Sequence, residues 1–327
     1  MVSSISTIMY NLELLNKKNS KVNYQMSSEN ALQYGSDNSQ QYNKILTIDN
    51  NVKSYSSILD RIQSSSVYNT TSDTSISSMK TKMESINGLI TKALTATTNS
   101  DNKVSIANEI ESAKDTIFSL SNTKVDGQYL FSGNSSSIET FQKDATTGKI
   151  SYASTNDNKT VNVENNVYNT QGVNGIELLY YTNQTAKTGE NITFDKNEII
   201  LDKAGNQYKL VDTNGDNSYD GLYLNGDTSN TALAITTNSD GSFTVNNSTS
   251  TTLQSKHSTF DLLDSVINAL KQQDSNGNAI TQDEATTILS TALDKFEKAY
   301  DAMNTTHSKL GLEQHQLIIM KIQFKQN

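Results

Sequence analysis

Asp126-Gly127-Gln128-Tyr129-Leu130-Phe131-Ser132-Gly133 marks the point where helix-period patterning ends and a strand-and-turn composition begins. Two glycines bracket an aromatic-aliphatic-aromatic run, and glycine takes backbone angles that other residues avoid. The octet therefore predicts a chain reversal in which Tyr129 and Phe131 pack back against a helix. We expect both rings to be largely buried.

Before the octet, apolar residues recur at alternating spacings of three and four, which is typical of helices that pack on other helices. The first stripe is narrow and would span roughly 30 Å at about 1.5 Å per residue. We predict that it forms an assembly seam made of Ile5, Ile8, Leu12, Leu15, Val22 and Met26.

Three further stripes follow, at residues 45–62, 76–90 and 106–120. Gly35 can end the first helix, and Ser36 or Asp37 can cap the second. The Ser/Thr/Asn cluster at 64–72 should weaken or end that second helix, because these side chains compete for backbone hydrogen bonds. A polar loop at 97–101 separates the last two stripes. Ordinary bundle packing accounts for each stripe better than a ligand-binding role.

After the octet the period changes to short alternating runs at residues 149–152, 160–163, 207–211 and 242–245, which predict strands. Hairpin turns are predicted at Asn214-Gly215, Asp220-Gly221, Asn225-Gly226 and Asp240-Gly241. After His257 the helical period returns, and it continues past a turn at 274–278 as far as Leu310.

These patterns predict an α+β fold: an elongated coiled-coil helical bundle built from both chain ends, with an inserted β-rich domain. We divide the chain into an N-terminal assembly helix at residues 1–36, a helical core domain at 37–135 and 255–311, an inserted outer β-rich domain at 136–254, and an atypical tail at 312–327.

Charge and composition argue against several classes of function. The 327-residue chain has 26 basic and 35 acidic residues and a net charge of −9, with Arg61 its single arginine, so nucleic acid is not an expected partner. It has no cysteine and no proline. The N-terminus lacks the basic and apolar regions of a cleaved signal peptide, and no stretch reaches membrane-spanning length.

Among residue types used in catalysis and metal binding, the sequence offers one weak candidate site, for calcium. The three histidines, His257, His307 and His315, fall in no nucleophile or metal-helix motif, so we expect surface histidines, no enzyme activity and no cofactor. Oxygen-bearing side chains at alternate positions resemble a calcium loop, but Asn217 and Tyr223 replace its glycine and glutamate. We therefore favour an Asx-rich hairpin over a calcium site for Asp212, Asn214, Asp216, Ser218 and Asp220.

The octet resembles a Gly-x-Tyr-Leu-Phe-Ser-Gly signature of the flagellin superfamily, in the branch of hook-associated proteins that join the bacterial flagellar hook to the filament. Ile5-Ser6-Thr7 with Tyr10 resembles the N-terminal start of that family. Gln25-Met26-Ser27-Ser28 and Gly35-Ser36-Asp37 resemble its Ser-rich helix end and Ser-Asp turn. The matched signature residues are Gly127, Tyr129, Leu130, Phe131, Ser132 and Gly133.

The resemblance covers about residues 1–135 and 255–311. Glu29-Asn30 and Asn38 depart mildly from the family pattern. Family members also continue past the region of Gly311 into an amphipathic helix that pairs with the N-terminal one. Residues 312–327 are too short for that role, which indicates truncation or an altered reading frame and leaves the N-terminal helix without its intramolecular partner.

The resemblance implies a structural subunit that joins hook to filament by self-assembly of its helical ends. The implied partners are copies of itself, other hook-associated proteins, flagellin and an export chaperone, with no membrane insertion. The implied location is the extracellular flagellum, reached without a cleaved signal peptide. Two alternatives stay open: a filament flagellin, and a secreted adhesin or glycan-binding protein that uses its β domain.

Overall fold

The computed structural model describes residues 2–28, 38–95, 100–164 and 167–326. The chain divides into two compact units, Met1–Asp60 and Arg61–Asn327. The first unit holds helix α1 (Val2–Ser28) and the beginning of helix α2 (Ser39–Ala93). The Asn38 side chain accepts a 3.1 Å hydrogen bond from the Gln41 N–H and caps α2. The predicted turn at Gly35-Ser36-Asp37, the departure at Glu29-Asn30 and the loop residues 97–99 lie outside the described residues.

Helix α2 passes through the Ser/Thr/Asn cluster at 64–72 without a break, so the expected end of the second helix was wrong. The hydroxyls are satisfied inside the helix: Thr70 and Ser72 donate to the carbonyls of Ser66 and Tyr68, four residues earlier. The three-four spacing also continues through the cluster. Its positions there are the buried polar residues Ser65, Asn69 and Ser72.

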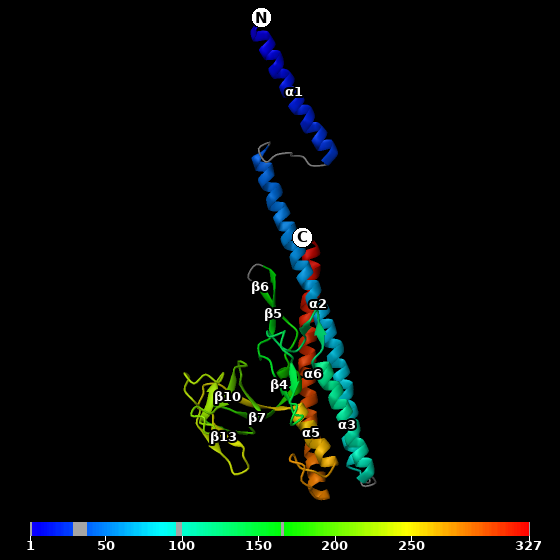
Figure 1. The fold of residues 1–327 in the computed structure, drawn as a ribbon, viewed down its shortest axis with the longest axis vertical. Coiled ribbons are helices and arrows are strands. Elements are labelled where there is room, and N and C mark those ends of the chain that lie inside the picture. The colour runs from blue at the N-terminus through cyan, green and yellow to red at the C-terminus, as the bar shows by residue number, and fades with distance from the viewer. Residues whose placement is uncertain (1, 29–37, 96–99, 165–166, 327) are drawn as a thin grey trace. The chain divides into compact units, whose positions relative to one another are not determined.

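In the second unit, α2 lies antiparallel to helix α6 (Gln282–Gln326) (Figure 1). Hydrogen bonds between side chains join the two helices, and the residue numbers of the bonded partners decrease along α2 as they increase along α6. The joined pairs are Glu84 with Tyr300, Asp73 with His307, Thr70 with Gln314, and Gln63 with Lys321. Helix α6 continues through Gly311, so the sequence-based boundary of the tail at 311–312 falls inside one helix.

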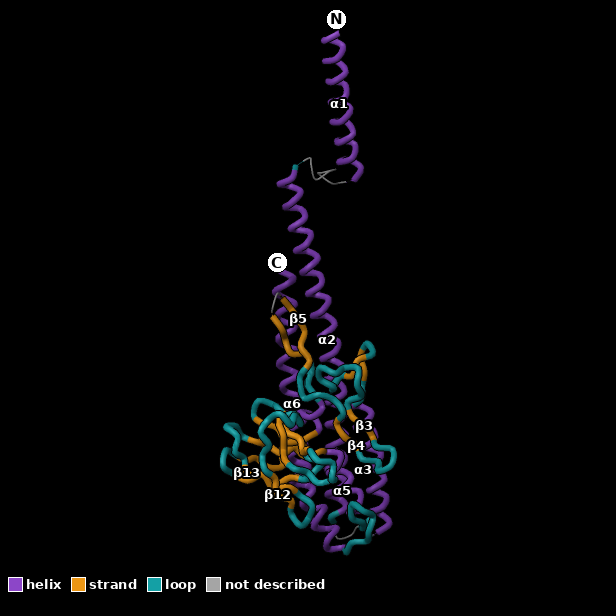
Figure 2. The backbone as a smooth tube through the Cα atoms, turned by 60° about the vertical axis from the view of Figure 1, so that its left-hand side comes forward, coloured by secondary structure: helices purple, strands orange, loops and turns teal. Residues whose placement is uncertain are grey.

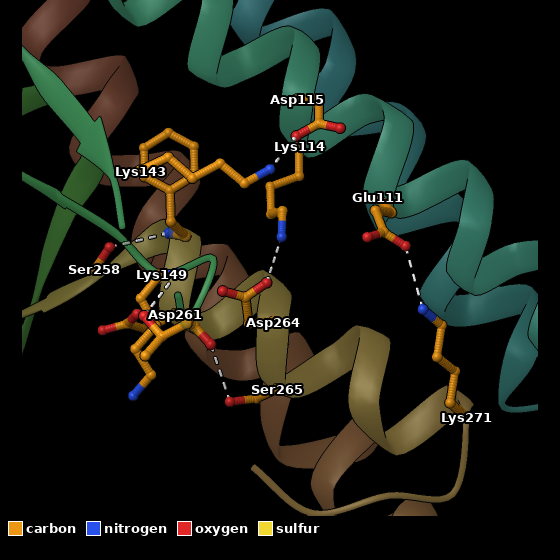
Figure 3. Close-up of polar contacts among 12 residues, drawn as sticks. Glu111, Lys114, Asp115, Lys143, Lys149, Ser258, Asp261, Asp264, Ser265 and Lys271 are labelled. Atoms are coloured by element: carbon orange, nitrogen blue, oxygen red, sulfur yellow. Dashed lines mark hydrogen bonds and ion pairs between the residues drawn. The ribbon is translucent and has the colours of Figure 1, made fainter. Parts of the chain in front are cut away.

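Helices α3 (Ser100–Ser121) and α5 (Thr259–Leu270) complete the bundle (Figure 1). Ion pairs join them along one side: Lys114 Nζ lies 2.5 Å from Asp264 Oδ1, and Lys271 Nζ lies 3.2 Å from Glu111 Oε2 (Figure 3). The Lys114 side chain is buried, so Asp264 supplies the opposite charge that a buried ammonium requires. None of the described helices is long and apolar enough to span a bilayer.

The chain between α3 and the outer strands forms antiparallel two-stranded pairs and one short helix. Helix α4 (Gly175–Leu179) was not among the predicted elements. It is capped by Asn174, whose Oδ1 accepts a hydrogen bond from the Glu177 N–H at 2.8 Å. The paired strands are β1 (Lys124–Val125) with β2 (Gln128–Tyr129), β3 (Phe141–Lys143) with β4 (Ile150–Tyr152), and β5 (Lys159–Glu164) with β6 (Val167–Gln171).

The remaining strands form two antiparallel sheets, one of five strands in the order β11-β10-β9-β14-β7 and one of three in the order β12-β13-β8. The strands are β7 (Tyr180–Ala186), β8 (Asn191–Phe194), β9 (Ile199–Asp202), β10 (Gln207–Val211), β11 (Gly221–Leu224), β12 (Ile235–Thr237), β13 (Phe243–Asn246) and β14 (Leu253–Ser258). The expected turn at Asp220-Gly221 was wrong, because Gly221 begins β11 opposite Val211 and the hairpin turn lies before it.

Two hydrophobic cores result. The larger joins the helices to Phe141, Ile150 and Tyr181, so the strands that follow the octet share the helical core. The smaller lies within the outer sheets and includes Ile192, Phe243 and Leu253. Figure 2 shows β3 and β4 along the helices and β12 and β13 away from them. The sequence-based boundary at 135–136 therefore does not separate the two cores.

Candidate assembly surface

Helix α1 presents large apolar side chains to solvent. Leu12 is 58% exposed and Leu15 is 63% exposed, whereas Ile76 and Met83 at the same heptad spacing in the second unit are completely buried. The side chain of Ile5 lies outside the described residues. The described members of the predicted seam are all exposed: Ile8, Leu12, Leu15, Val22 and Met26.

The beginning of α2 continues this character within the first unit. Its exposed apolar residues are Tyr42, Ile45, Leu46, Ile48, Val52 and Tyr55. We name the exposed apolar residues of α1 and of this part of α2 the apolar stripes. Large exposed apolar areas of this kind mark interaction surfaces in soluble proteins.

Charged residues border the apolar stripes in short-range pairs. Glu13 and Lys17 lie 3.1 Å apart on α1, and Asp49 and Lys53 lie 2.7 Å apart on α2, each at the i,i+4 spacing. Exposed pairs of this kind stabilise an isolated helix by only about 0.3–0.5 kcal/mol. They leave most of the stability of these helices to be supplied by packing of the apolar faces.

The octet at residues 126–133 forms a tight hairpin followed by a buried anchor. Asp126 and Gly127 both have positive φ, 50° and 76°, and connect β1 to β2 as an Asp-Gly hairpin turn. Gly133 has φ 59°, and a Cβ there would lie 2.1 Å from the Asp157 carbonyl oxygen. The predicted roles of both glycines are confirmed.

The two octet rings lie in different surroundings. Phe131 is fully buried in the larger core, as expected. Tyr129 is only half-buried, because its ring faces the Lys124 ammonium, 4.2 Å away across the β1–β2 pair, and not the core. The expectation of two largely buried rings was therefore right for Phe131 and wrong for Tyr129.

Backbone groups of the octet are tied to three other segments. The Tyr68 hydroxyl of α2 donates to the Leu130 carbonyl at 2.6 Å, and the Gly175 N–H of α4 donates to the Phe131 carbonyl at 2.8 Å. The Ser154 hydroxyl donates to the Ser132 carbonyl at 2.5 Å. The octet thus fixes where the chain leaves the helices. Sequence reasoning missed Tyr68, although its large ring inside a polar cluster was a signal.

The calcium-like segment connects β10 to β11, and its oxygens accept hydrogen bonds from its own backbone. The Asp212 carboxylate accepts from the N–H groups of Asn214, Gly215 and Asn217, at 3.2, 2.7 and 2.8 Å. Two bonds from Thr213 lower the pKa of Asp220. This geometry supports the Asx-rich hairpin.

The histidines differ from the surface residues that we expected. His257 and His307 are mostly buried and pair with Glu198 and Asp73, at 3.0 and 2.7 Å, while His315 is exposed. Asp195, Glu198 and His257 also bring ligand atoms within 4.8 Å of one another, the one such group of three among the described residues. Nothing in the sequence pattern indicated this approach between residues so far apart.

Comparison with known proteins places the fold. No family model and no curated protein matches the sequence. Among solved structures, FlgL from Xanthomonas campestris aligns with a TM-score of 0.57 and 14% identity over 85% of this chain and 96% of that one. The flagellar junction protein FlgL from Legionella pneumophila aligns with a TM-score of 0.53 and 15% identity over 88% of this chain and 97% of that one. A putative flagellar hook-associated protein from Vibrio parahaemolyticus aligns with a TM-score of 0.58 and 13% identity over 90% of this chain and 95% of that one.

This chain therefore has the fold of these flagellar proteins over nearly all of their length. The predicted α+β architecture, with helices from both chain ends and a β-rich region between them, is confirmed.

Proposed function

We propose that this protein is a structural subunit of the bacterial flagellum that joins hook to filament through self-assembly of its helical ends. The observation that carries the proposal is the exposure of the apolar stripes in a chain with the fold of flagellar junction proteins. A single chain leaves these residues in water, and packing against helices of other subunits would remove them from it. The protein then acts by packing and needs no catalytic group.

The partners follow from this mode of action. Further copies of the chain, other hook-associated proteins and flagellin would present helices of similar spacing to the apolar stripes. Before assembly, an export chaperone that covers these stripes would prevent aggregation. The working location is the extracellular flagellum. We keep the division into an assembly helix, a helical core and an outer β-rich region as part of the proposal.

The test removes apolar side chains from the part of the apolar stripes on α1 and leaves that helix intact. Leu12→Gln with Leu15→Gln keeps good helix formers and deletes the two apolar contacts. Tyr168→Gln, an exposed residue of β6, is the matched control. In a bacterium that lacks its own junction protein, the double variant should fail to restore filaments, and wild type and control should restore them. Normal filaments with the double variant would overturn the proposal.

A second experiment separates assembly from adhesion. Ala186 of β7 and Leu253 of β14 are partners in the sheet, so residues 187–252 can be replaced by a two-residue turn between neighbouring strands. A junction protein should still incorporate into the flagellum without these residues. Loss of incorporation, in a variant whose helical core still melts cooperatively, would favour the adhesin alternative, whose binding function would lie in the outer sheets.

A further inference from the structure

A tight turn and a strand end meet where the outer sheets join the helices. Asp195 and Glu198 flank the turn from β8 to β9, which is closed by a 2.9 Å hydrogen bond from the Glu198 N–H to the Asp195 carbonyl. Strand β14 pairs with β9 so that Lys256 lies opposite Ile199. The next residue of β14, His257, therefore lies beside Glu198, just before the start of α5.

The Glu198 carboxylate is buried and only partly satisfied. Its side chain is 2% exposed, and its Oε1 accepts from Asn183 Nδ2 at 2.8 Å and lies 3.0 Å from His257 Nδ1. Its Oε2 is buried and has no hydrogen-bond partner. Burying a carboxylate oxygen without a hydrogen-bond donor or a cation beside it costs free energy, so a ligand at this atom would stabilise the fold.

The surroundings carry more negative than positive charge. Burial raises the pKa of Asp261, in the first turn of α5; His257 and Lys149 act to lower this pKa, and Asp264 and Asp195 act to raise it. Figure 3 shows Asp261 on α5 close to Lys149, with Asp264 turned toward Lys114. The carboxylates of Asp195, Glu198 and Asp261 thus lie near the His257 imidazole and the Lys149 ammonium, which interacts with Asp261. A divalent cation would balance this charge.

Solvent can reach the group. A cavity of about 490 Å³ is lined by Asp195, His257 and Asp261 among others, and its lysines are Lys114, Lys143, Lys149 and Lys271. An ion could enter through this cavity while Glu198 holds it from the buried side.

We propose that Asp195, Glu198 and His257 bind a divalent transition-metal ion of the Zn²⁺ class. One imidazole nitrogen with two carboxylates is a donor set that such ions accept, and the remaining positions can hold water from the cavity. His257 Nδ1 and Glu198 Oε1 lie 3.0 Å apart and share a hydrogen bond, which a bound ion would replace. Two ligands bound about 2.1 Å from one ion stand about 3.0–3.4 Å apart, so the two side chains are already close enough to share an ion, with the unpartnered Oε2 available as a further ligand atom.

The ion would join two elements that no disulfide can join in a chain without cysteine. It would hold the β8–β9 turn to the end of β14, and through β14 to the N-terminus of α5. These elements connect the smaller core to the larger one, so bound metal would restrain the outer sheets against the helical core. This inference does not rest on the proposed flagellar function.

The test uses the full-length chain, first stripped with a chelator and then titrated with Zn²⁺ by calorimetry and thermal melting. Zn²⁺ should bind at one saturable site and raise the melting temperature by several degrees, since binding to the native state stabilises it by mass action. Glu198→Gln and His257→Gln should each weaken binding by roughly tenfold or more. The quantity compared is the metal-dependent shift of each variant, so a lower starting stability does not confuse the result.

Matched controls define the outcome. His307→Gln removes another partly buried histidine that has a carboxylate partner but, among the described residues, no third ligand. Asp212→Ala alters the calcium-like hairpin, and both variants should keep full Zn²⁺ binding. If His257→Gln does not fold, Asp195→Asn changes an exposed turn residue and tests the same site. Absence of Zn²⁺ binding below roughly 1 mM, binding unchanged in Glu198→Gln and Asp195→Asn, or a shift with Ca²⁺ but not with Zn²⁺ would each overturn the proposal.

Discussion

The Tyr68 hydroxyl donates a 2.6 Å hydrogen bond to the Leu130 carbonyl oxygen, joining α2 to the octet across a separation of 62 residues. The same hydroxyl lies 3.2 Å from the Tyr129 carbonyl. Burial of the ring raises the pKa of Tyr68, so the hydroxyl keeps its proton and remains a donor. This contact sets the position at which the chain turns away from the helices.

Tyr68→Phe should lower the free energy of unfolding of the helical core by about 1–2 kcal/mol, because it keeps the ring and leaves buried carbonyl oxygens without their donor. Chemical denaturation of the full chain measures this loss. Tyr10→Phe, at an exposed position of α1, should change the same transition by less than about 0.5 kcal/mol. Equal effects from the two variants would show that the Tyr68 hydroxyl contributes nothing specific.

Phe131→Ala should destabilise the helical core by roughly 3–5 kcal/mol, because it empties a fully buried site of the larger core. Phe243→Ala is the control, since Phe243 packs in the smaller core. It should lower the transition of the outer sheets and leave that of the helices nearly unchanged. A single transition that both variants move equally would contradict separate unfolding of the two cores.

Much of this fold follows from local chemistry. The alternating stripes, the Asp-Gly pair in the octet and the glycine at 133 each act within a few residues, so the sequence predicts them. The sequence also indicates that α2 is continuous, since the alternating three-four spacing runs from Ile62 through the buried residues Ser65, Asn69 and Ser72 to Ile76. The predicted helix end at 64–72 is wrong because it rests on the low helix propensity of Ser, Thr and Asn, which packing overrides.

Other features depend on distant contacts and could not be predicted. Helix α4 has five residues, too few to show a period. The pairing of α6 with α2 depends on register between segments more than 200 residues apart. The approach of Glu198 to His257 requires β9 to lie beside β14, which no local pattern fixes. The exposure of Tyr129 depends on Lys124 taking the space above its ring.

Gly133→Ala should destabilise the helical core more than Gly127→Ala does. Both glycines have positive φ, which costs about 1–2 kcal/mol for an L-residue, but only at Gly133 would the new Cβ also meet backbone, 2.1 Å from the Asp157 oxygen. The surroundings of Gly127 are open. Denaturation midpoints of the two variants test this. Similar losses would mean that the Asp157 loop moves aside at little cost.

Glu313 should make stability depend on pH. Burial raises its pKa from the ordinary 4.5 to about 7, opposed by Lys309 and supported by Glu177. Between these values the folded chain binds more protons than the unfolded chain, so stability falls as pH rises from about 4.5 to 7 and is then constant. Below about 4.5 the carboxyl is neutral in both states and the penalty disappears.

Glu313→Gln removes the charge and should stabilise the protein at pH 8 by on the order of 1–2 kcal/mol, less than the full shift implies because partial solvent access screens the charge. The gain should vanish near pH 4.5. Glu297→Gln, at an exposed position of the same helix, should give no comparable pH-dependent gain. Urea denaturation at several pH values measures the differences. A gain at Glu313 that is equal at all pH values would indicate packing and not ionisation.

Helix α1 leaves Leu12 and Leu15 largely exposed. Helix α1 has 27 residues, exposes its apolar side chains, and its Glu13–Lys17 ion pair contributes little to helix stability. In the free monomer, the backbone amides of Leu12 and Leu15 should therefore exchange with solvent much faster than those of Met79 and Met83, whose side chains are completely buried. On assembly with other subunits the α1 amides should become protected, because packing would then oppose their opening, while those of Met79 and Met83 should change little. Hydrogen exchange read by mass spectrometry on monomer and assembled material compares the two helices in one experiment. Strong protection of Leu12 and Leu15 already in the monomer would mean that α1 is stable without partners, and α1 would then not be the helix that orders on assembly.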